Sequence, residues 1–151
     1  MSDSLNWQCR HFSDLTANVL YDIMRARSAV FVVEQNCVYL DADGIDQECY
    51  HFCGYNGKEL VAYTRLIAPG TMYLEASIGR VITTASYRRT GLGKELMTLS
   101  IAKCRELFGA SPLKIGAQLY LEKFYNSFGF RRISDVYLED GIEHIHMLLS
   151  V

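Results

Sequence analysis

The sequence predicts an α+β domain built on a mixed sheet. Two kinds of pattern indicate this class: apolar residues at helical spacing in some segments, and β-rich runs flanking tight-turn dipeptides in others. Along the chain they alternate in the order β-α-β-β-β-α-β-α-β-β. We find no internal repeat, linker or low-complexity tract, so residues 1–151 are treated as one domain, long enough to bury a core.

The first elements are a strand and a long helix. The strand is expected at Trp7–Phe12, where polar and apolar residues alternate loosely. Ser13 and Asp14 can cap the helix that follows. Its apolar positions recur at helical spacing, namely Val19, Leu20, Ile23, Met24, Val30 and Phe31. We expect it to end near Glu34–Asn36, before a loop at Asp41–Asp46.

A hairpin and a further strand follow this loop. In Tyr50–Ala68 two β-rich runs flank Asn56-Gly57, a dipeptide that accepts positive φ in a tight turn. Pro69-Gly70 then interrupts the pattern, and the next strand is expected at Ala76–Thr84. A polar turn leads from this strand into the second helix.

The second half of the chain starts with that helix, whose apolar positions are Leu96, Met97, Ile101, Cys104 and Phe108. Gly109 and Pro112 are expected to end it. The remaining elements are a buried strand at Leu113–Gln118, a short helix within Leu119–Phe130, and two strands at Arg131–Asp140 and Ile142–Val151. Asp140-Gly141 is the expected turn between the last two strands.

Composition limits the classes of partner and compartment. The net charge of −2 does not favour nucleic acid or an anionic membrane as the main partner. Five cysteines without a pairing pattern indicate a reducing compartment rather than a disulfide framework. The N-terminus lacks the pattern of a signal peptide, and no stretch approaches the ~18 apolar residues of a spanning helix. We therefore expect a cytoplasmic protein.

The polar turn Ser86–Met97 has the features of a phosphate-binding loop. A helix N-terminus exposes unpaired N–H groups and a partial positive charge. Gly91 and Gly93 allow close approach of the backbone to a ligand. The full positive charges come from Arg88, Arg89 and Lys94. A solvated basic turn before a surface helix is the alternative.

Two common nucleotide loops do not fit this turn. A nucleoside triphosphatase loop needs Ser or Thr after its Gly-Lys pair, and here Glu95 follows Lys94. A dinucleotide loop needs a third glycine, where this chain has Leu96. A dinucleotide loop also follows the first strand of a parallel sheet, whereas this turn follows about the fourth predicted strand. Neither class of nucleotide-binding protein is therefore predicted.

A third pattern does fit. Arg88-x-x-Gly91-x-Gly93, between a strand and an amphipathic helix, resembles the pyrophosphate loop of the GNAT superfamily of N-acetyltransferases. Lys123–Phe130 resembles the F-Y-x-x-x-G-F signature of that superfamily. Four further segments resemble its ElaA-like branch: Val30–Tyr39, Ile78–Ile82, Gly116–Gln118 and Glu139–Ile145. One departure is Leu119-Tyr120, where an alanine–histidine pair is expected.

The resemblance implies a GNAT fold, a mostly antiparallel twisted sheet of about seven strands flanked by helices. In it, a splayed strand pair makes a slot for acetyl-coenzyme A (acetyl-CoA). The pyrophosphate would lie on N–H groups of the loop, and the pantetheine arm would pair with the preceding strand. The implied cofactor-binding residues are Val81, Ile82, Thr83, Arg88, Arg89, Thr90, Gly91, Leu92, Gly93, Lys94 and Gln118.

The implied reaction is acetyl transfer from acetyl-CoA to an amine by direct attack in a ternary complex. Tyr125 occupies the position of the acid that protonates the leaving thiolate, and a phenol with a reference pKa of about 10 is protonated at neutral pH. Glu34, after an apolar run, is expected to be partly buried and is the candidate base. His51, Glu143, His144 and a water relay are alternatives.

Two arginines have open roles at this stage. Arg27 is the one charge on an apolar helical face, so it either extends to solvent or pairs with a buried carboxylate such as Glu34. Arg80 either faces the acceptor site or lies in solvent.

The sequence also leaves two other functions open, a zinc site and a non-catalytic sensor. Cys49, His51 and Cys53 alternate and share a strand face, which could hold zinc, although no metal is expected. A non-catalytic acyl-CoA sensor with the same loop is a second alternative. The acidic loop residues Asp41, Asp43, Asp46 and Glu48 either attract a cationic amine or are simply solvated. The acceptor, a small molecule or peptide, is unidentified, and the resemblance is compatible with a homodimer.

Overall fold

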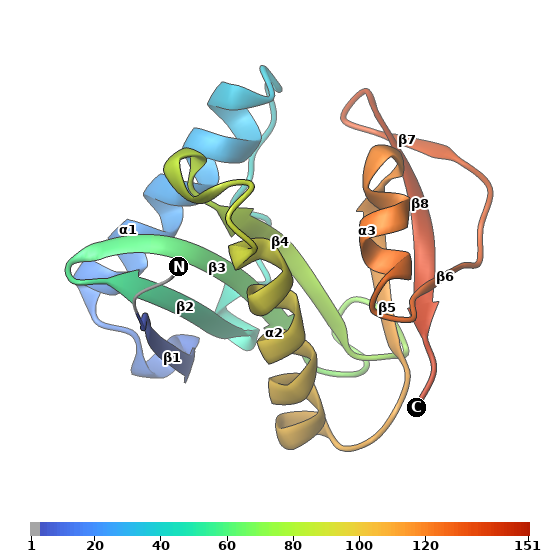
Figure 1. Ribbon diagram of the computed structural model, residues 1–151, viewed down its shortest axis with the longest axis horizontal. Helices are drawn as coiled ribbons and strands as arrows, with labels where there is room; N and C mark the ends of the chain where they lie inside the picture. The colour runs from blue at the N-terminus through green and yellow to red at the C-terminus, as the bar shows by residue number, and fades with distance from the viewer. Residues whose placement is uncertain (1–3) are drawn as a thin grey trace.

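The computed structural model describes residues 4–151, which form eight strands in two sheets flanked by helices (Figure 1). The strands are β1 Asn6–His11, β2 Tyr50–Asn56, β3 Glu59–Ile67, β4 Ser77–Thr83, β5 Leu113–Gln118, β6 Arg131–Arg132, β7 Tyr137–Glu139 and β8 Ile142–Leu149. The main helices are α1 Ala17–Arg27, the π-helical continuation η2 Ser28–Glu34, α2 Leu92–Phe108 and α3 Glu122–Asn126. The expected α+β class is confirmed, with one more strand than the approximate number implied by the resemblance.

The two sheets are antiparallel within themselves. The first has the order β1-β2-β3-β4, and the second has the order β5-β8-β6 with β7 also pairing with β8. The predicted β2–β3 hairpin is confirmed, but its two-residue turn is Gly57-Lys58, one residue later than the predicted Asn56-Gly57, because Asn56 pairs with Glu59. Gly57 has φ of +63°. A side chain there would be strained by this φ, which explains the glycine.

The first and second sheets meet at β4 and β5 and then diverge. In the described residues these neighbours share one parallel bridge, Ala76–Leu113, with the Lys114 N–H donating to the Ala76 carbonyl at 2.9 Å. Farther along β4, the register with β3 shifts at Arg80, whose φ is +51°. Such a bulge bends a strand. Since β4 and β5 belong to different sheets and share the one bridge above within the described residues, they form the expected splayed strand pair.

One hydrophobic cluster joins both sheets to α2. It contains Val61 and Leu66 of β3, Leu96 and Met97 of α2, and Ile145 of β8, among others. The opposite face of the first sheet is covered by α1 through a second cluster that includes Ile23, Tyr63 and Ile82. The two sheets are therefore held together by a common core around α2.

The start of the first helix differs from the prediction. Thr16, rather than Ser13 or Asp14, caps α1, because its Oγ1 accepts the Val19 N–H at 3.2 Å. Ser13 and Asp14 instead belong to a short 3-10 turn. The helical pattern through Phe31 is confirmed, although its last part is π-helical.

The strand expected at Arg131–Asp140 is also different, since it is divided into β6 and β7. The Ile133 N–H still donates to the His146 carbonyl at 2.9 Å. The His146 N–H, however, donates to the Ser134 Oγ at 2.8 Å, so a side chain replaces the strand partner. The ladder is interrupted there.

None of the helices within residues 4–151 combines the length and apolar character needed to cross a membrane.

Candidate active site

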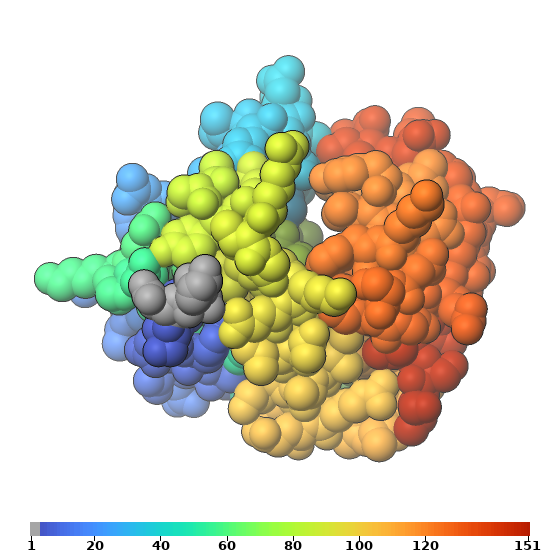
Figure 2. Space-filling model, in the orientation of Figure 1, coloured from blue at the N-terminus to red at the C-terminus, as the bar shows by residue number. Residues whose placement is uncertain are grey.

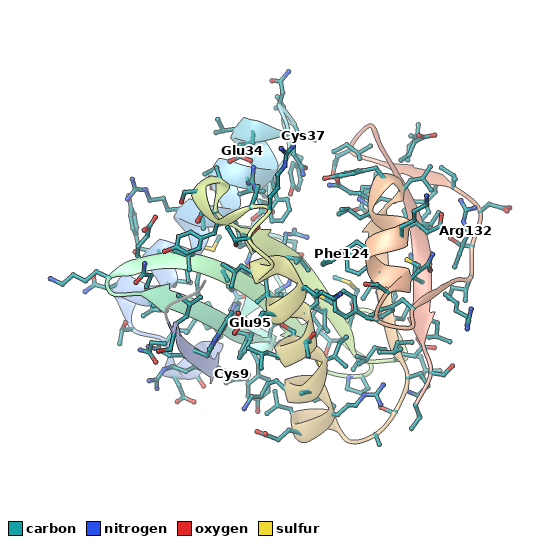
Figure 3. All side chains as sticks on the ribbon, viewed as in Figure 1. Cys9, Glu34, Cys37, Glu95, Phe124 and Arg132 are labelled. Atoms are coloured by element: carbon teal, nitrogen blue, oxygen red, sulfur yellow. The ribbon has the colours of Figure 1, made fainter. Side chains whose placement is uncertain are left out.

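A cavity of about 420 Å³ lies where β4 and β5 separate. Figure 2 shows the surface hollowed between the yellow-green segment after β4 and the orange and red C-terminal part. Its walls include Arg80 to Thr83 of β4 and Ile115 to Gln118 of β5. Glu34 of η2 and Tyr125 of α3 line it from other elements. Figure 3 labels Glu34 on η2 and, on α3, Phe124, the residue before Tyr125 in the chain.

The structure brings most of the predicted site residues together. The cavity is lined by Glu34, Val81, Ile82, Thr83, Arg88, Gln118 and Tyr125. The remaining loop residues, Arg89 to Lys94, continue from Arg88 along the chain to the start of α2. We call Arg88–Lys94 the glycine loop.

The glycine loop presents backbone N–H groups at the start of α2. The first helical hydrogen bond runs from the Glu95 N–H to the Gly91 carbonyl at 3.1 Å, so the Leu92, Gly93 and Lys94 N–H groups precede the helical ladder. Gly91 has φ of +87°, and a Cβ placed on it would meet nothing within 4 Å. The space beside Gly91 is therefore open, which is compatible with an anion approaching the loop.

Arg88 connects this loop to η2 and to β4. Its Nη2 donates to the Glu34 Oε1 at 2.8 Å, and its Nε donates to the Thr83 carbonyl at 3.2 Å. The Glu34 side chain is 42% exposed. Glu34 is therefore only partly covered, and its carboxylate pairs with an arginine.

Tyr125 is 6% exposed and packs edge-on against Phe124 and Phe130, with ring centroids 5.1 and 6.0 Å away. Burial raises the pKa of the Tyr125 hydroxyl above its ordinary value, with a smaller contribution from Tyr120. The phenol is therefore protonated at neutral pH. Tyr125 also lines the cavity, so it is both a packed aromatic residue and part of the cavity wall.

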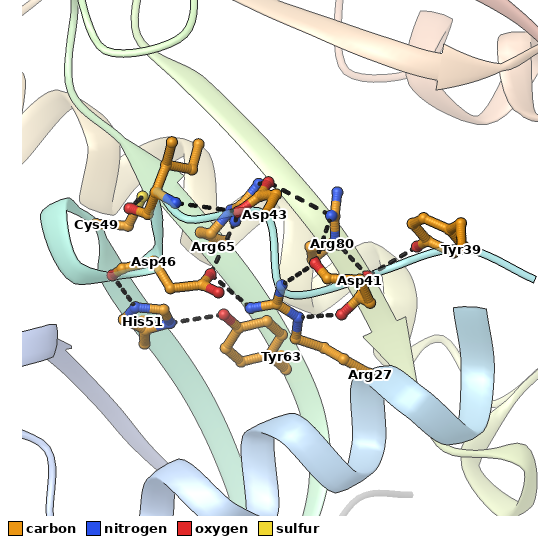
Figure 4. A network of polar contacts seen from close by, with 11 residues as sticks. Arg27, Tyr39, Asp41, Asp43, Asp46, Cys49, His51, Tyr63, Arg65 and Arg80 are labelled. Carbon is orange, nitrogen blue, oxygen red and sulfur yellow. Dashed lines mark hydrogen bonds and ion pairs between the residues drawn. The ribbon is translucent and has the colours of Figure 1, made fainter. Parts of the chain in front are cut away.

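A buried arginine–aspartate network lies beside the cavity (Figure 4). It consists of Arg27, Arg65, Arg80, Asp41, Asp43 and Asp46. Arg27 is fully buried and lies 2.7 Å from Asp41 and 2.6 Å from Asp46. The suggested partner Glu34 is therefore wrong for Arg27, although the alternative of a buried carboxylate is correct.

The same network corrects the interpretation of the acidic loop. Asp41 and Asp46 are buried, and Asp43 lies 2.8 Å from Arg65, so these three carboxylates are paired within the fold. Glu48 is exposed, as the solvated alternative predicted. Burial opposes ionisation of Asp43, but the Arg65 hydrogen bond and charge outweigh it and lower the pKa of Asp43 to about 2. The loop is held onto the sheet by these pairs.

Arg80 extends the network to the cavity wall. Its Nε donates to the Asp41 Oδ1 at 2.8 Å, and the Tyr39 hydroxyl donates to the same oxygen at 2.7 Å. Both Arg80 and Tyr39 line the cavity. Arg80 therefore faces the cavity rather than bulk solvent, with its charge balanced by Asp41.

The candidate zinc ligands are used in other contacts. The His51 Nε2 donates to the Asp46 carbonyl at 3.0 Å, and its Nδ1 accepts from the Tyr63 hydroxyl at 2.6 Å. The Cys49 thiol donates to the Ile45 carbonyl at 3.1 Å. Across residues 4–151 no group of three or more His, Cys, Asp or Glu side chains is arranged to hold a metal ion.

The alternative bases differ in position. His144 lines the cavity, whereas His51 is buried beneath the network, and burial lowers the pKa of its imidazole. Glu143 is exposed on the other face of β8. The structure therefore brings His144, of these three, into the site with Glu34 and Tyr125.

Comparison with known proteins agrees with this geometry. Residues 25–151 match the family model described as an acetyltransferase (GNAT) domain. The protein ElaA of Escherichia coli is 41% identical, with 97% of each chain covered. A crystal structure of an acyl-CoA N-acyltransferase from Pseudomonas aeruginosa superposes with a TM-score of 0.93 at 38% identity, covering 97% of this chain and all of that one. The crystal structure of E. coli ElaA gives a TM-score of 0.87 at 39% identity, covering 97% and 99%. The chain belongs to the GNAT acetyltransferase family.

Proposed function

We propose that the protein transfers the acetyl group of acetyl-CoA to a primary amine of a small molecule or peptide, by direct attack in a ternary complex. The main supporting observation is the cavity between β4 and β5, which has the glycine loop at one edge and Tyr125 in its wall. The Pseudomonas aeruginosa protein of similar structure is described as an acyl-CoA N-acyltransferase, which is the same class of reaction.

The residues at the glycine loop fit a CoA pyrophosphate. The N–H groups of Leu92, Gly93 and Lys94 are the donors, with Arg89 and Thr90 on the same exposed turn. Along β4, the Val81, Ile82 and Thr83 backbone borders the cavity beyond the bridge to β5. This edge can pair with an extended pantetheine arm, with Gln118 opposite on β5.

In this reaction the amine nitrogen gives up a proton and forms a bond to the thioester carbonyl carbon. The carbon–sulfur bond then breaks, and the leaving thiolate takes the hydroxyl proton of Tyr125. The raised pKa of the Tyr125 hydroxyl keeps it protonated before the reaction. The amine proton goes to a base on the cavity wall, where Glu34 and His144 are the candidates.

A panel of polyamines, amino acids, aminoglycosides and peptides tests the proposal, with thiol release from acetyl-CoA as the readout. The protein should acetylate at least one amine above the rate of hydrolysis. Tyr125→Phe should lower kcat by about 10²-fold or more while leaving the affinity for acetyl-CoA unchanged. A protein that binds acetyl-CoA but acetylates no amine in the panel, would instead be a sensor of the same fold.

A further inference from the structure

We propose that His144 is the general base that takes the proton of the acceptor amine, through its Nε2. This assignment rests on the proposed acetyl transfer and adds the residue that starts it. The evidence in the fold is the fixed orientation of the imidazole, its place on the cavity wall, and the engagement of the competing groups.

A backbone hydrogen bond determines the tautomer of the His144 imidazole. The His144 Nδ1 lies 2.7 Å from the Ile142 carbonyl oxygen. A carbonyl can only accept, so Nδ1 carries the hydrogen in this contact. The neutral ring therefore has its lone pair on Nε2, where a base needs it.

His144 lies on the face of β8 opposite the residues that enter the core. Ile145 and Met147 point into the cluster that also contains Tyr125. Because side chains alternate along a strand, His144 is on the opposite face. It is 8% exposed, and it lines the cavity. Tyr125 belongs to the cluster on the first of these faces, so the proposed acid and the proposed base reach the cavity from different faces of the second sheet.

A carboxylate lies near the nitrogen of His144 that would take the proton. Glu139 of β7 places its Oε2 3.9 Å from the His144 Nε2, so it can stabilise the imidazolium. The Tyr137 ring stacks on His144 with centroids 5.8 Å apart, and His146 is the next residue on the same face.

The other charged groups that line the cavity are Arg80, Arg88, Glu34 and Asp140. Each arginine is paired, Arg80 with Asp41 and Arg88 with Glu34. Both arginines that line the cavity are therefore already engaged with carboxylates.

The same contacts argue against the other bases. The Glu34 carboxylate already accepts a hydrogen bond from Arg88 at 2.8 Å, so it is engaged in an ion pair. Both His51 ring nitrogens are hydrogen-bonded, at 2.6 and 3.0 Å. His144 combines a free ring nitrogen with a cavity position. In the step, the amine proton moves to Nε2 as the nitrogen–carbon bond forms. The imidazolium later gives this proton to water, and water reprotonates the Tyr125 phenolate, which restores both groups.

The test uses the full chain, acetyl-CoA and the amine from the panel with the highest kcat/KM. In His144→Gln, kcat/KM for the amine should fall by about 10²- to 10⁴-fold, and the acidic limb of its pH profile should disappear. Acetyl-CoA affinity should not change. Added imidazole should partly restore the rate of His144→Ala. His146→Gln is the matched control, since His146 shares the face and the Tyr137 stack, and it should keep the wild-type rate and profile.

A second measurement does not need an acceptor. Side-chain ¹⁵N spectra of the wild-type protein should show neutral His144 as the Nδ1–H tautomer. The Nε2–H tautomer would overturn the assignment.

The possible failures are distinguishable. If the wild-type protein acetylates an amine and His144→Gln keeps both its rate within about threefold and its acidic limb, His144 is not the base. Loss of that limb in Glu34→Gln alone would give the role to Glu34. If the wild-type protein acetylates none of the amines, the acetyl transfer itself is wrong, and the base with it.

Discussion

The two groups of basic residues around the cavity differ in how their charges are balanced. Arg27 and Arg65, inside the arginine–aspartate network, are buried and meet aspartates at 2.6 to 2.9 Å. Arg89 and Lys94, in the glycine loop, are exposed. A buried charge needs a partner within the fold, whereas an exposed one can receive its partner from outside. The network therefore suits a structural role, and the glycine loop suits binding of an anion.

The largest expected effect is on the network. Arg27→Ala leaves Asp46 and Asp41 without one of their buried partners, and it should lower the free energy of unfolding by about 3–5 kcal/mol. Chemical denaturation measures this. The control is Arg25→Ala, because Arg25 is exposed on the same helix and should change stability by about 0.5 kcal/mol or less. Equal losses in both variants would contradict the difference between buried and exposed arginines.

The converse is expected at the glycine loop. Gly93→Glu should weaken acetyl-CoA binding by about 10²-fold, since a carboxylate would stand among the phosphate donors. Stability should change little, because a Cβ at Gly93 lies 3.9 Å from Phe124, an ordinary contact. Calorimetric titration with acetyl-CoA gives the affinity. Gly93→Ala, which adds the Cβ without the charge, should bind nearly as the wild type does, and unchanged affinity in Gly93→Glu would count against the loop.

A smaller effect is expected from acid. The pKa of Asp43 is lowered from 3.8 to about 2 in the fold, so Asp43 stabilises the protein above pH 3.8, and this contribution is lost as the pH falls through about 2. Asp43→Asn should lack this part of the acid dependence, a difference of roughly 1 kcal/mol after allowing for its partial exposure. Unfolding curves of both proteins between these pH values measure it. Parallel curves would show that the Arg65 pair does not contribute.

The sequence predicted the glycine loop because its residues are close together along the chain. Its glycines and basic residues all lie within Arg88–Lys94, where the pattern is local. The network could not be predicted this way. Arg27 pairs with Asp41 and Asp46, which are 14 and 19 residues away, and Arg80 pairs with Asp41 at a separation of 39. Nothing along the chain selected Asp46 over Glu34 as the partner of Arg27.

The strands show the same limit. The β2–β3 hairpin was predicted because Asn-Gly is a local turn signal, although the turn itself lies one residue later, at Gly57-Lys58. The interruption between β6 and β7 was missed, since it depends on the Ser134 Oγ accepting the N–H of His146, 12 residues later. Similarly, the tautomer of His144 depends on a carbonyl geometry that residue types do not reveal. Local rules thus predicted the elements and the loop, while contacts between distant segments decided the site.

The central claim is that acyl-CoA binds in the cavity between β4 and β5 with its pyrophosphate on the glycine loop. Backbone ¹H–¹⁵N spectra recorded during titration with CoA test it directly. We expect the largest shifts at the Leu92, Gly93 and Lys94 amides, with further shifts at Val81 to Thr83. Saturating CoA that leaves these amides unchanged, or that shifts only residues outside the cavity, would contradict the account.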